Sequence, residues 1–367
     1  MEKKLKILHT NTGMVAGGAE RLIADMLPLL KERGQHVELL LVEDKGNNIF
    51  ENHIIDSAIK INKLPYNNKF DLRNIFHIRK KIRDFDVVHV HLFPLLYLVP
   101  LATIGMWNRP LLILTEHNTH NRRRNLKVLK IIEKFIYSKY DKVISISPES
   151  ESNLLNWLNE TKTTKFEVVL NGVNLELFKH AVPLSRNQIL GQKIEDGSKF
   201  LLMTARFDSQ KDHETLFKAL KIVPDFIKLL LIGEGKLDEK YKWLIKNLEL
   251  ENRVFFLGSR NDVPNVLKAV DISILSSNWE GFGLVIIEAM CAGVPVIASS
   301  VPGVKSIVAE NGLLFEKGDY QELATHIMTL INDEKVYAFY RKQGLKRAEE
   351  FNVERMVEKY TAIYNGL

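Results

Sequence analysis

Short runs of β-branched and other apolar residues alternate with amphipathic helical stretches along almost the whole chain of 367 residues. Such alternation is typical of parallel sheets whose helical connections cover both faces. The series occurs twice, so we predict an α/β fold of two doubly wound, Rossmann-like domains in tandem. The predicted strands are residues 5–10, 36–43, 86–92, 111–117, 142–147 and 166–171, and then 200–206, 227–233, 254–258, 272–276, 294–298 and 312–315.

The boundary between the domains is predicted where the periodicity fades, over residues 174–198. Pro183, Asn187, Gly191 and Gly197 interrupt a polar stretch there, which is typical of a linker. We therefore expect an N-terminal domain over residues 1–180 and a C-terminal domain over 181–350. Open α/β sheets bind ligands at the carboxyl ends of their strands. A cleft between two such sheets is expected to hold the functional site.

Composition excludes several classes of protein. A single cysteine, Cys291, allows no internal disulfide, and its apolar neighbours predict a buried position. No apolar run approaches the roughly 20 residues that a membrane-spanning helix needs. The first residues lack the apolar stretch of a signal peptide, so we expect a cytoplasmic protein.

Positive charge is concentrated in the first half of the chain. Residues 1–180 hold 27 Lys and Arg against 20 Asp and Glu, a net charge of +7, whereas the remainder holds 24 against 25, or −1. The densest clusters are residues 79–83 and 122–130. Such clusters are usually solvated helix faces, but they also suit an anionic membrane surface or acceptor. Aromatic residues do not alternate with them, so nucleic acid is not expected.

Two carboxylates eight residues apart, Glu280 and Glu288, flank a glycine-rich turn between a predicted strand and a helix. Gly281 and Gly283 keep side chains away, so backbone N–H groups and the helix N-terminus can approach phosphate or sugar oxygens. Carboxylates are also good acceptors for sugar hydroxyls. A turn with two solvated acids is the simpler interpretation, but the apolar segment 289–298 extends the pattern beyond a turn.

Arg206 and Lys211 follow the first predicted strand of the second domain. A departing nucleoside diphosphate needs its developing charge neutralised, and fixed cations can do this without a metal. An Arg and a Lys at this spacing are often ordinary surface residues. Their position after a strand and ahead of the two carboxylates favours a phosphate clamp.

In the first domain, Gly17 and Gly18 follow the first strand and open a helix, so they permit close approach of an anion. The spacing is not that of a dinucleotide-binding fingerprint. His117 ends the fifth strand, with His120 beyond it and His89 and His91 at the end of the preceding strand. A histidine metal site is one interpretation. We prefer a polar contact from His117 to a substrate, with Arg122, Arg123 and Arg124 near an acceptor.

Taken together, these motifs make the chain resemble the retaining glycosyltransferases of family 4, whose two Rossmann-like domains form the GT-B architecture. The resemblance covers nearly the whole chain. The matching segments are residues 17–20, 86–92, 116–118, 171–174, Arg206 with Lys211, 233–235, 256–258, 280–288 and 311–314.

The resemblance implies roles for individual residues. Arg206 and Lys211 would hold the diphosphate of a nucleotide sugar, Glu288 the ribose and Glu280 the donor sugar. The sugar and diphosphate would be lined by the backbone of Gly281, Phe282, Gly283 and Leu284, and the turn after Gly258 would contact the base. His117 would lie beside the transferred sugar. Gly17 and Gly18 would approach from the other domain. Of these, His117, Glu280, Arg206 and Lys211 are the expected catalytic residues. The family pattern also implies that residues 351–367 form a helix that returns to the first domain.

One segment departs from the family pattern. After Ala298-Ser299-Ser300 the family usually has two glycines and then a glutamate, whereas this chain has Val301-Pro302-Gly303-Val304-Lys305-Ser306. The family pattern therefore does not predict which contacts this loop makes.

The expected activity is transfer of a hexose-type sugar, with retention, from a UDP- or GDP-sugar to a lipid-linked or glycan acceptor in bacterial surface polysaccharide synthesis. The resemblance implies no metal and no cofactor; retention by front-face attack or by a covalent intermediate stays open. A peripheral position on the inner face of the cell membrane is a further expectation. The alternatives are a nucleotide-sugar epimerase or hydrolase, a non-catalytic partner subunit and, more distantly, a nicotinamide-dependent dehydrogenase.

Overall fold

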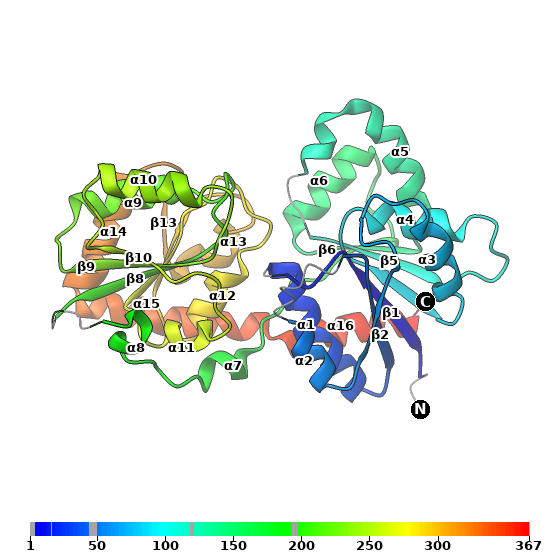
Figure 1. The fold of residues 1–367 in the computed structure, drawn as a ribbon, viewed down its shortest axis with the longest axis horizontal. Helices are drawn as coiled ribbons and strands as arrows, with labels where there is room; N and C mark the ends of the chain where they lie inside the picture. Colours follow the sequence, from blue (N-terminus) through cyan, green and yellow to red (C-terminus); the bar gives the residue numbers. More distant parts are fainter. Residues whose placement is uncertain are drawn as a thin grey trace. The chain divides into compact units, whose positions relative to one another are not determined.

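Two α/β units, each built on one parallel sheet, make up the chain (Figure 1). The computed structural model describes residues 4–15, 17–43, 50–117, 121–192, 195 and 197–366, with the backbone alone for Arg122 and Asn125. The first unit comprises Met1–Gly172 together with Val353–Leu367, and the second comprises Val173–Asn352.

The sheet of the first unit has seven strands in the order β3-β2-β1-β4-β5-β6-β7. Their bounds are β1 (Lys6–Asn11), β2 (His36–Leu41), β3 (Lys60–Lys63), β4 (Val87–Val90), β5 (Leu111–Glu116), β6 (Lys142–Ser145) and β7 (Phe166–Val168). The central strands are buried on both faces, which is why they are almost continuously apolar.

Helices cover both faces of this sheet. One apolar core lies under α1 (Gly18–Glu32), α2 (Glu51–Asp56) and α16 (Val353–Gly366). A second core lies under α3 (Asn74–Ile82), α4 (Leu95–Thr103), α5 (Lys127–Ser138) and α6 (Pro148–Leu158), and the 3-10 helix η1 (Arg122–Asn125) precedes α5. The last helix of the chain thus belongs to the first unit, where it packs beside α1 (Figure 1).

The sheet of the second unit has six strands in the order β10-β9-β8-β11-β12-β13. Their bounds are β8 (Lys199–Thr204), β9 (Ile227–Ile232), β10 (Val254–Phe256), β11 (Ile272–Leu275), β12 (Val296–Ser299) and β13 (Leu313–Phe315). The helices are α7 (Leu175–Lys179), α8 (Arg186–Leu190), α9 (His213–Ile222), α10 (Asp238–Asn247), α11 (Val263–Leu267), α12 (Leu284–Cys291), α13 (Lys305–Val308), α14 (Tyr320–Asn332) and α15 (Glu334–Ala348), with the 3-10 helices η2 (Ala309–Asn311) and η3 (Glu349–Phe351).

The segment predicted as a linker is folded structure of the second unit, so that prediction is wrong for most of its length. Leu175 and Phe178 of α7 are buried, and Cys291 of α12 donates from Sγ to the carbonyl oxygen of Leu175 at 3.2 Å. The side chain of Ser185 caps α8. The second unit therefore begins at Val173, eight residues before the predicted boundary at residue 181.

Each sheet has one point at which the strand order reverses, between β1 and β4 in the first unit and between β8 and β11 in the second. The carboxyl ends of the strands at such a switch point leave a crevice that no helical connection covers, and open α/β folds bind ligands there. Among the described helices, none is long and apolar enough to cross a membrane.

Candidate functional site

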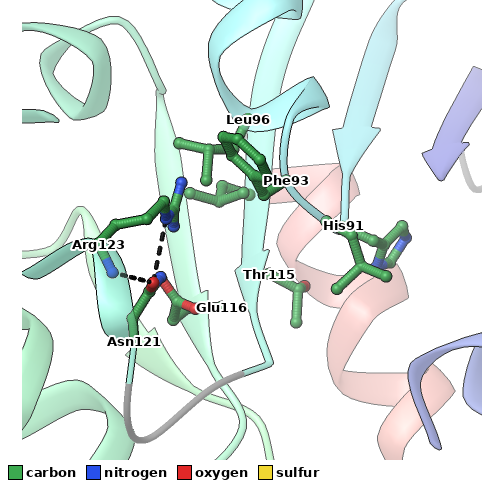
Figure 2. Close-up of a pocket in the computed structure, with 9 residues that line it drawn as sticks. His91, Phe93, Leu96, Thr115, Glu116, Asn121 and Arg123 are labelled. Carbon is green, nitrogen blue, oxygen red and sulfur yellow. Dashed lines mark hydrogen bonds between the residues drawn. The ribbon is translucent and has the colours of Figure 1, made fainter. Parts of the chain in front are cut away.

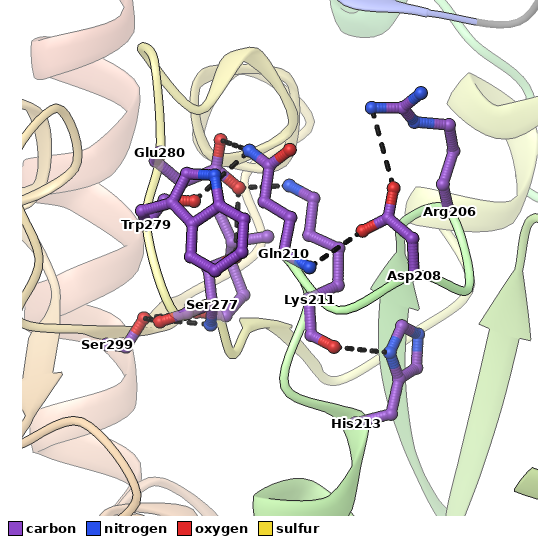
Figure 3. Close-up of polar contacts among 10 residues, drawn as sticks. Arg206, Asp208, Gln210, Lys211, His213, Ser277, Trp279, Glu280 and Ser299 are labelled. Carbon is purple, nitrogen blue, oxygen red and sulfur yellow. Dashed lines mark hydrogen bonds and ion pairs between the residues drawn. The ribbon is translucent and has the colours of Figure 1, made fainter. Parts of the chain in front are cut away.

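The switch point of the second unit brings together two loops that the sequence places about 70 residues apart. The loop after β8 carries Arg206 and Lys211, and the loop after β11 carries Ser277 and Glu280. Lys211 and Ser277 also pair as an isolated antiparallel bridge, which fixes one loop against the other. The backbone thus holds two of the predicted site residues, Lys211 and Glu280, in contact (Figure 3).

Glu280 is a buried carboxylate, 6% exposed, surrounded by donors. Its Oε1 accepts hydrogen bonds from the Lys211 ammonium and from the Ser277 hydroxyl, the latter at 2.9 Å. Gln210 Nε2 lies 3.5 Å from Oε2 and 3.1 Å from the carbonyl oxygen of Trp279 (Figure 3). Because a buried carboxylate is costly without such partners, this network fixes the position of Glu280.

Ser277, Gln210 and Ser299 were not among the predicted site residues. Ser299 at the end of β12 accepts from the Ser277 amide and donates to the Ser277 carbonyl oxygen, both at 2.9 Å. The only signal in the sequence is that small polar residues follow two neighbouring strands. Contacts of this kind depend on strand order, which the sequence pattern alone does not give.

Arg206 lies on the same loop as Lys211, but its side chain points away from Glu280 (Figure 3). The Arg206 side chain is 63% exposed, and its Nη2 lies 3.7 Å from Asp208 Oδ2. The cation is therefore accessible at the carboxyl edge of the sheet, whereas Lys211 is largely buried. The contact of Arg206 with a phosphate stays a prediction.

Close backbone approaches explain the glycines around this loop. A Cβ atom at Gly233 or Gly235 would collide with the carbonyl oxygens of Ala205 and Phe207, respectively, on the loop that carries Arg206. The Gly233 amide also donates to the carbonyl oxygen of Gly258 at 2.9 Å. The loops after β8, β9 and β10 are thus packed together by their backbones, which is possible only without side chains.

Helix α12 begins directly after Gly283, whose φ of +83° lies in the left-handed region that favours glycine. Gly281 and Leu284 are partly exposed, Phe282 is buried, and Glu288 is partly exposed one turn along the helix. Cys291 is buried in this helix, as predicted, and burial raises the pKa of its thiol to about 11.

The segment that departs from the family pattern lies against the glycine-rich turn. Gly303 has a φ of +87°, and a Cβ there would lie 2.7 Å from the carbonyl oxygen of Glu280 and 2.9 Å from that of Gly281. The single glycine of Val301–Ser306 is therefore required where this loop contacts the turn. It supports the backbone next to Glu280.

The switch point of the first unit contains a chain of histidines, of which His9, His89 and His91 are buried and His117 is partly exposed. His9 Nδ1 lies 2.9 Å from His91 Nε2, and His91 Nδ1 lies 3.1 Å from His117 Nε2. His89 stacks on His91, with ring centroids 4.3 Å apart, and its two nitrogens contact Tyr364 Oη at 2.6 Å and Thr115 Oγ1 at 2.7 Å. His117, one of the predicted catalytic residues, is thus held by His91.

Burial keeps these imidazoles neutral. It lowers the pKa of His9 to about 3 and that of His117 to about 4, and the pKa values of His89 and His91 lie well below the usual 6.5. A neutral imidazole has one N–H, so the bonds from His9 to His91 and from His91 to His117 must run in the same direction. The series of histidines ends at His9 Nε2, which has no hydrogen-bond partner among the described residues.

Nitrogens of His9, His89 and His91 lie within 4.8 Å of one another, a spacing at which three ligands could hold a metal ion. Both nitrogens of His89 already have hydroxyl partners, and His9 and His91 bond to each other. Hydrogen bonds therefore account for most of these nitrogens without a metal ion.

A cavity of about 200 Å³ opens beside the histidines, at the carboxyl ends of β4 and β5 (Figure 2). Its apolar wall is formed by Leu92, Phe93, Leu96 and Leu114, and its polar wall by His91, Thr115, Glu116, Asn121 and Arg123. A small cavity with one apolar and one polar wall suits a ligand such as a sugar.

The predicted acceptor arginines have partners within the first unit. Arg124 Nη2 contacts Glu116 Oε2 at 3.0 Å, and Tyr137 donates to the same carboxylate at 2.7 Å. Arg123 lies over the Phe93 ring and 3.6 Å from Glu133. Arg124 therefore has a structural contact, Arg123 borders the cavity, and the side chain of Arg122 lies outside the described residues, as do Asn118 and His120.

Gly17 is the N-cap of α1, and Gly18 is the first residue of that helix. Gly17 has an extended backbone and supplies no capping side chain. The predicted anion contact at this helix start is untested.

Two family models together match most of the chain. "Glycosyltransferase Family 4" matches residues 16–177, and "Glycosyl transferases group 1" matches residues 186–347. The chain belongs to family 4 of the glycosyltransferases. Its two parallel-sheet units are those of the GT-B fold, which confirms the predicted fold class and the resemblance.

Similar proteins cover the chain from end to end. It is 27% identical to an Escherichia coli UDP-Gal:alpha-D-GlcNAc-diphosphoundecaprenol alpha-1,3-galactosyltransferase, over 98% of this chain and 97% of the relative. It is also 27% identical to a Campylobacter jejuni N-acetylgalactosaminyltransferase that acts on a diphospho-undecaprenol-linked sugar, over 95% and 96%. Anabaena HepE, solved with UDP-glucose, shares the fold with a TM-score of 0.86 at 23% identity, over 99% of this chain and 100% of HepE.

Proposed function

We propose that this glycosyltransferase moves a hexose-type sugar from a UDP-sugar to a lipid-linked glycan acceptor, with retention and without a metal, in the synthesis of a bacterial surface polysaccharide. The observation that carries the proposal is the contact between Lys211 and Glu280 at the switch point of the second unit. A cation and a carboxylate held side by side provide one group for a diphosphate and one for sugar hydroxyls.

In this proposal the second unit binds the donor. The Lys211 ammonium has three N–H donors, so its contact with Glu280 leaves capacity for diphosphate oxygens. Arg206 adds a second, exposed cation, and Glu288 and Glu280 accept from the ribose and the sugar. HepE, which shares the fold, was solved with UDP-glucose, which supports uridine over guanosine.

The reaction exchanges one bond to the anomeric carbon for another. The C1–O bond to the β-phosphate breaks, a C1–O bond to the acceptor oxygen forms, and the acceptor hydroxyl releases one proton. Lys211 and Arg206 neutralise the departing diphosphate, and such fixed charges stabilise a transition state in which charge develops. His117, held neutral by burial, offers a hydrogen bond to the transferred sugar and carries no charge.

The first unit is proposed to bind the acceptor. Its cavity, lined by Phe93 and Arg123 among others, has room for a sugar ring. The E. coli and C. jejuni relatives are named for acceptors that carry a diphosphoundecaprenol, which supports a lipid-linked glycan acceptor.

Thermal unfolding with added UDP, GDP, ADP or NAD, each with and without EDTA, tests the donor site. A ligand that binds only the folded state stabilises it by about 2.7 kcal/mol at a hundred times its Kd. We expect a shift with UDP that EDTA does not change. A shift with NAD alone, or one that EDTA abolishes, would contradict the proposal.

An activity assay separates the transferase from its rivals on the same donor site. UDP release from a UDP-sugar should require a lipid diphosphate-linked sugar, and the new linkage should have the anomeric configuration of the donor by NMR. Release without an acceptor would indicate a hydrolase, and a changed sugar still attached to UDP would indicate an epimerase. Nucleotide binding without any turnover would fit a non-catalytic partner subunit.

A further inference from the structure

Helix α5 carries an apolar stripe that faces solvent. Val128, Ile131, Ile132 and Phe135 are 66%, 77%, 47% and 49% exposed. Their spacing of three and four residues places them in one row along the helix. Leu126, the residue directly before the helix, is also apolar and 59% exposed.

The opposite face of α5 accounts for its attachment to the first unit. Glu133 is fully buried and accepts from Tyr97 Oη at 2.5 Å and from Trp157 Nε1 at 2.7 Å. Ile136 and Tyr137 are buried in the core under α3–α6. The helix is therefore anchored through its inner face, and the exposed stripe is not needed for that packing.

Lysines border the stripe. At 100° per residue, Lys127, Lys130 and Lys134 lie together on one flank of the row of apolar residues. Lys127 and Lys134 are exposed, and Lys130 is partly exposed. Lys139 Nζ lies over the Phe135 ring, 4.7 Å from its centroid, so a further cation sits at the end of the stripe.

We infer that α5 is the element by which this protein docks on an anionic phospholipid bilayer, with the stripe (Val128, Ile131, Ile132 and Phe135) in the acyl–headgroup boundary and the lysines on lipid phosphates. A helix with one apolar row and a basic flank lies in the plane of such an interface. A second copy of the chain fits less well, because a self-complementary contact would set these lysines against one another.

The inference rests on the proposed function for its meaning, since a lipid-linked acceptor is presented at a bilayer. Helix η1, which directly precedes α5, carries Arg123 into the wall of the cavity. Docking through α5 would therefore bring the cavity close to the plane from which a lipid-linked sugar projects.

Vesicle flotation of the full chain tests the docking surface, with phosphatidylcholine vesicles that contain or lack phosphatidylglycerol. We expect binding to the anionic vesicles that weakens in high salt, because salt screens exposed charges. The triple variant Lys127→Gln/Lys130→Gln/Lys134→Gln should bind at least tenfold more weakly, since each lysine near an anionic surface contributes roughly fivefold. The double variant Ile131→Ser/Phe135→Ser should lose binding to a similar degree, roughly tenfold, by reducing the buried apolar area.

The matched control is Trp243→Ser/Lys246→Gln on α10 of the second unit, where Trp243 is 63% exposed. It should leave flotation unchanged. All variants replace surface residues, and an unchanged unfolding temperature and UDP response would show that they fold.

Two results would overturn the inference. One is equal binding of the wild type to neutral and anionic vesicles, or binding that the α5 variants retain. The other is a dimer by light scattering that Ile131→Ser/Phe135→Ser dissociates, which would make the stripe a contact between copies. A chain that floats as expected yet shows no UDP response would instead count against the proposed function alone.

Discussion

The ammonium of Lys211 has two tasks in the proposed site, because it neutralises the buried carboxylate of Glu280 and is placed to meet a diphosphate. Removing it therefore changes the carboxylate as well as the ligand contact. An experiment on Lys211 needs a companion variant that removes the charge of Glu280, so that the two effects can be separated.

We predict that Lys211→Ala weakens UDP binding by about tenfold or more, since a charge-assisted hydrogen bond contributes roughly 1.5–3 kcal/mol. Isothermal titration with UDP measures the loss. Lys211→Ala/Glu280→Gln should restore stability but not affinity, because it removes the uncompensated buried charge without replacing the cation. Lys221→Ala, on an exposed lysine of α9, is the control, and equal affinities for Lys211→Ala and wild type would remove Lys211 from the diphosphate site.

Glu288 is predicted to bind the ribose of the nucleotide. This contact involves neither the phosphates nor the transferred sugar. Glu288→Ala should therefore weaken the binding of UDP and of a UDP-sugar by the same factor, about tenfold or more, since a hydrogen bond to a charged group contributes roughly 1.5–3 kcal/mol. Titration with UDP and with a UDP-sugar checks this equality. A larger loss for the UDP-sugar would place Glu288 at the sugar, where Glu280 is expected.

At the level of elements, the sequence pattern predicts most strands and helices because their periodicities differ. The pattern misses α4, since its residues are apolar on every side and Pro100 lies within it. It also misses β3, a four-residue edge strand with the sequence Lys-Ile-Asn-Lys, which is too short and too polar to show a strand pattern. The sequence pattern also does not give the order of the strands in the sheet. Only the pairing of β8 with β11 shows that the loops after these strands meet. The contacts of Ser277 and Gln210 with Glu280 follow from that pairing.

Helix α16 completes the first unit, and its tyrosines reach the histidine chain. Tyr364 contacts His89, and Tyr360 Oη lies 3.1 Å from Thr115 Oγ1. The family pattern supplied the expectation of a returning helix, whereas local periodicity could not have done so. No pattern in the sequence pointed to the contact between the helix and His89.

We predict that Tyr364→Phe lowers the free energy of unfolding by about 1–3 kcal/mol, because it leaves His89 Nδ1 buried without a partner. Tyr360→Ala should cost about 3–5 kcal/mol by opening a cavity under α16. Urea unfolding, followed by a probe in the first unit, measures both. Tyr340→Phe, which removes a partly exposed hydroxyl from α15, should change stability little, and a similar loss there would argue against the role given to Tyr364.

On the scale of the whole molecule, the described histidines whose pKa burial lowers are unevenly distributed. His9, His89, His91 and His117 lie in the first unit, whereas His213, whose pKa burial lowers to about 4, lies in the second. All five favour the neutral form in the fold. The two units should therefore respond differently to mild acid.

The sign of the response follows from proton binding. The unfolded chain takes up a proton at each of these histidines near pH 6.5, whereas the fold resists uptake until a much lower pH. Stability is therefore independent of these groups above about pH 7 and decreases as the pH falls below 6.5, by up to about 1.4 kcal/mol per pH unit for each histidine.

Thermal unfolding between pH 7.5 and 5.5, above the range in which most carboxylates titrate, tests this prediction. The first unit, with four such histidines, should lose stability more steeply than the second, so a single transition at neutral pH should broaden or split as the pH falls. His9→Asn should reduce the slope, because it removes one buried imidazole, whereas His180→Gln, on a side chain that is 78% exposed, should not. A uniform response of both units would mean that protonation of the histidine chain does not limit the stability of the first.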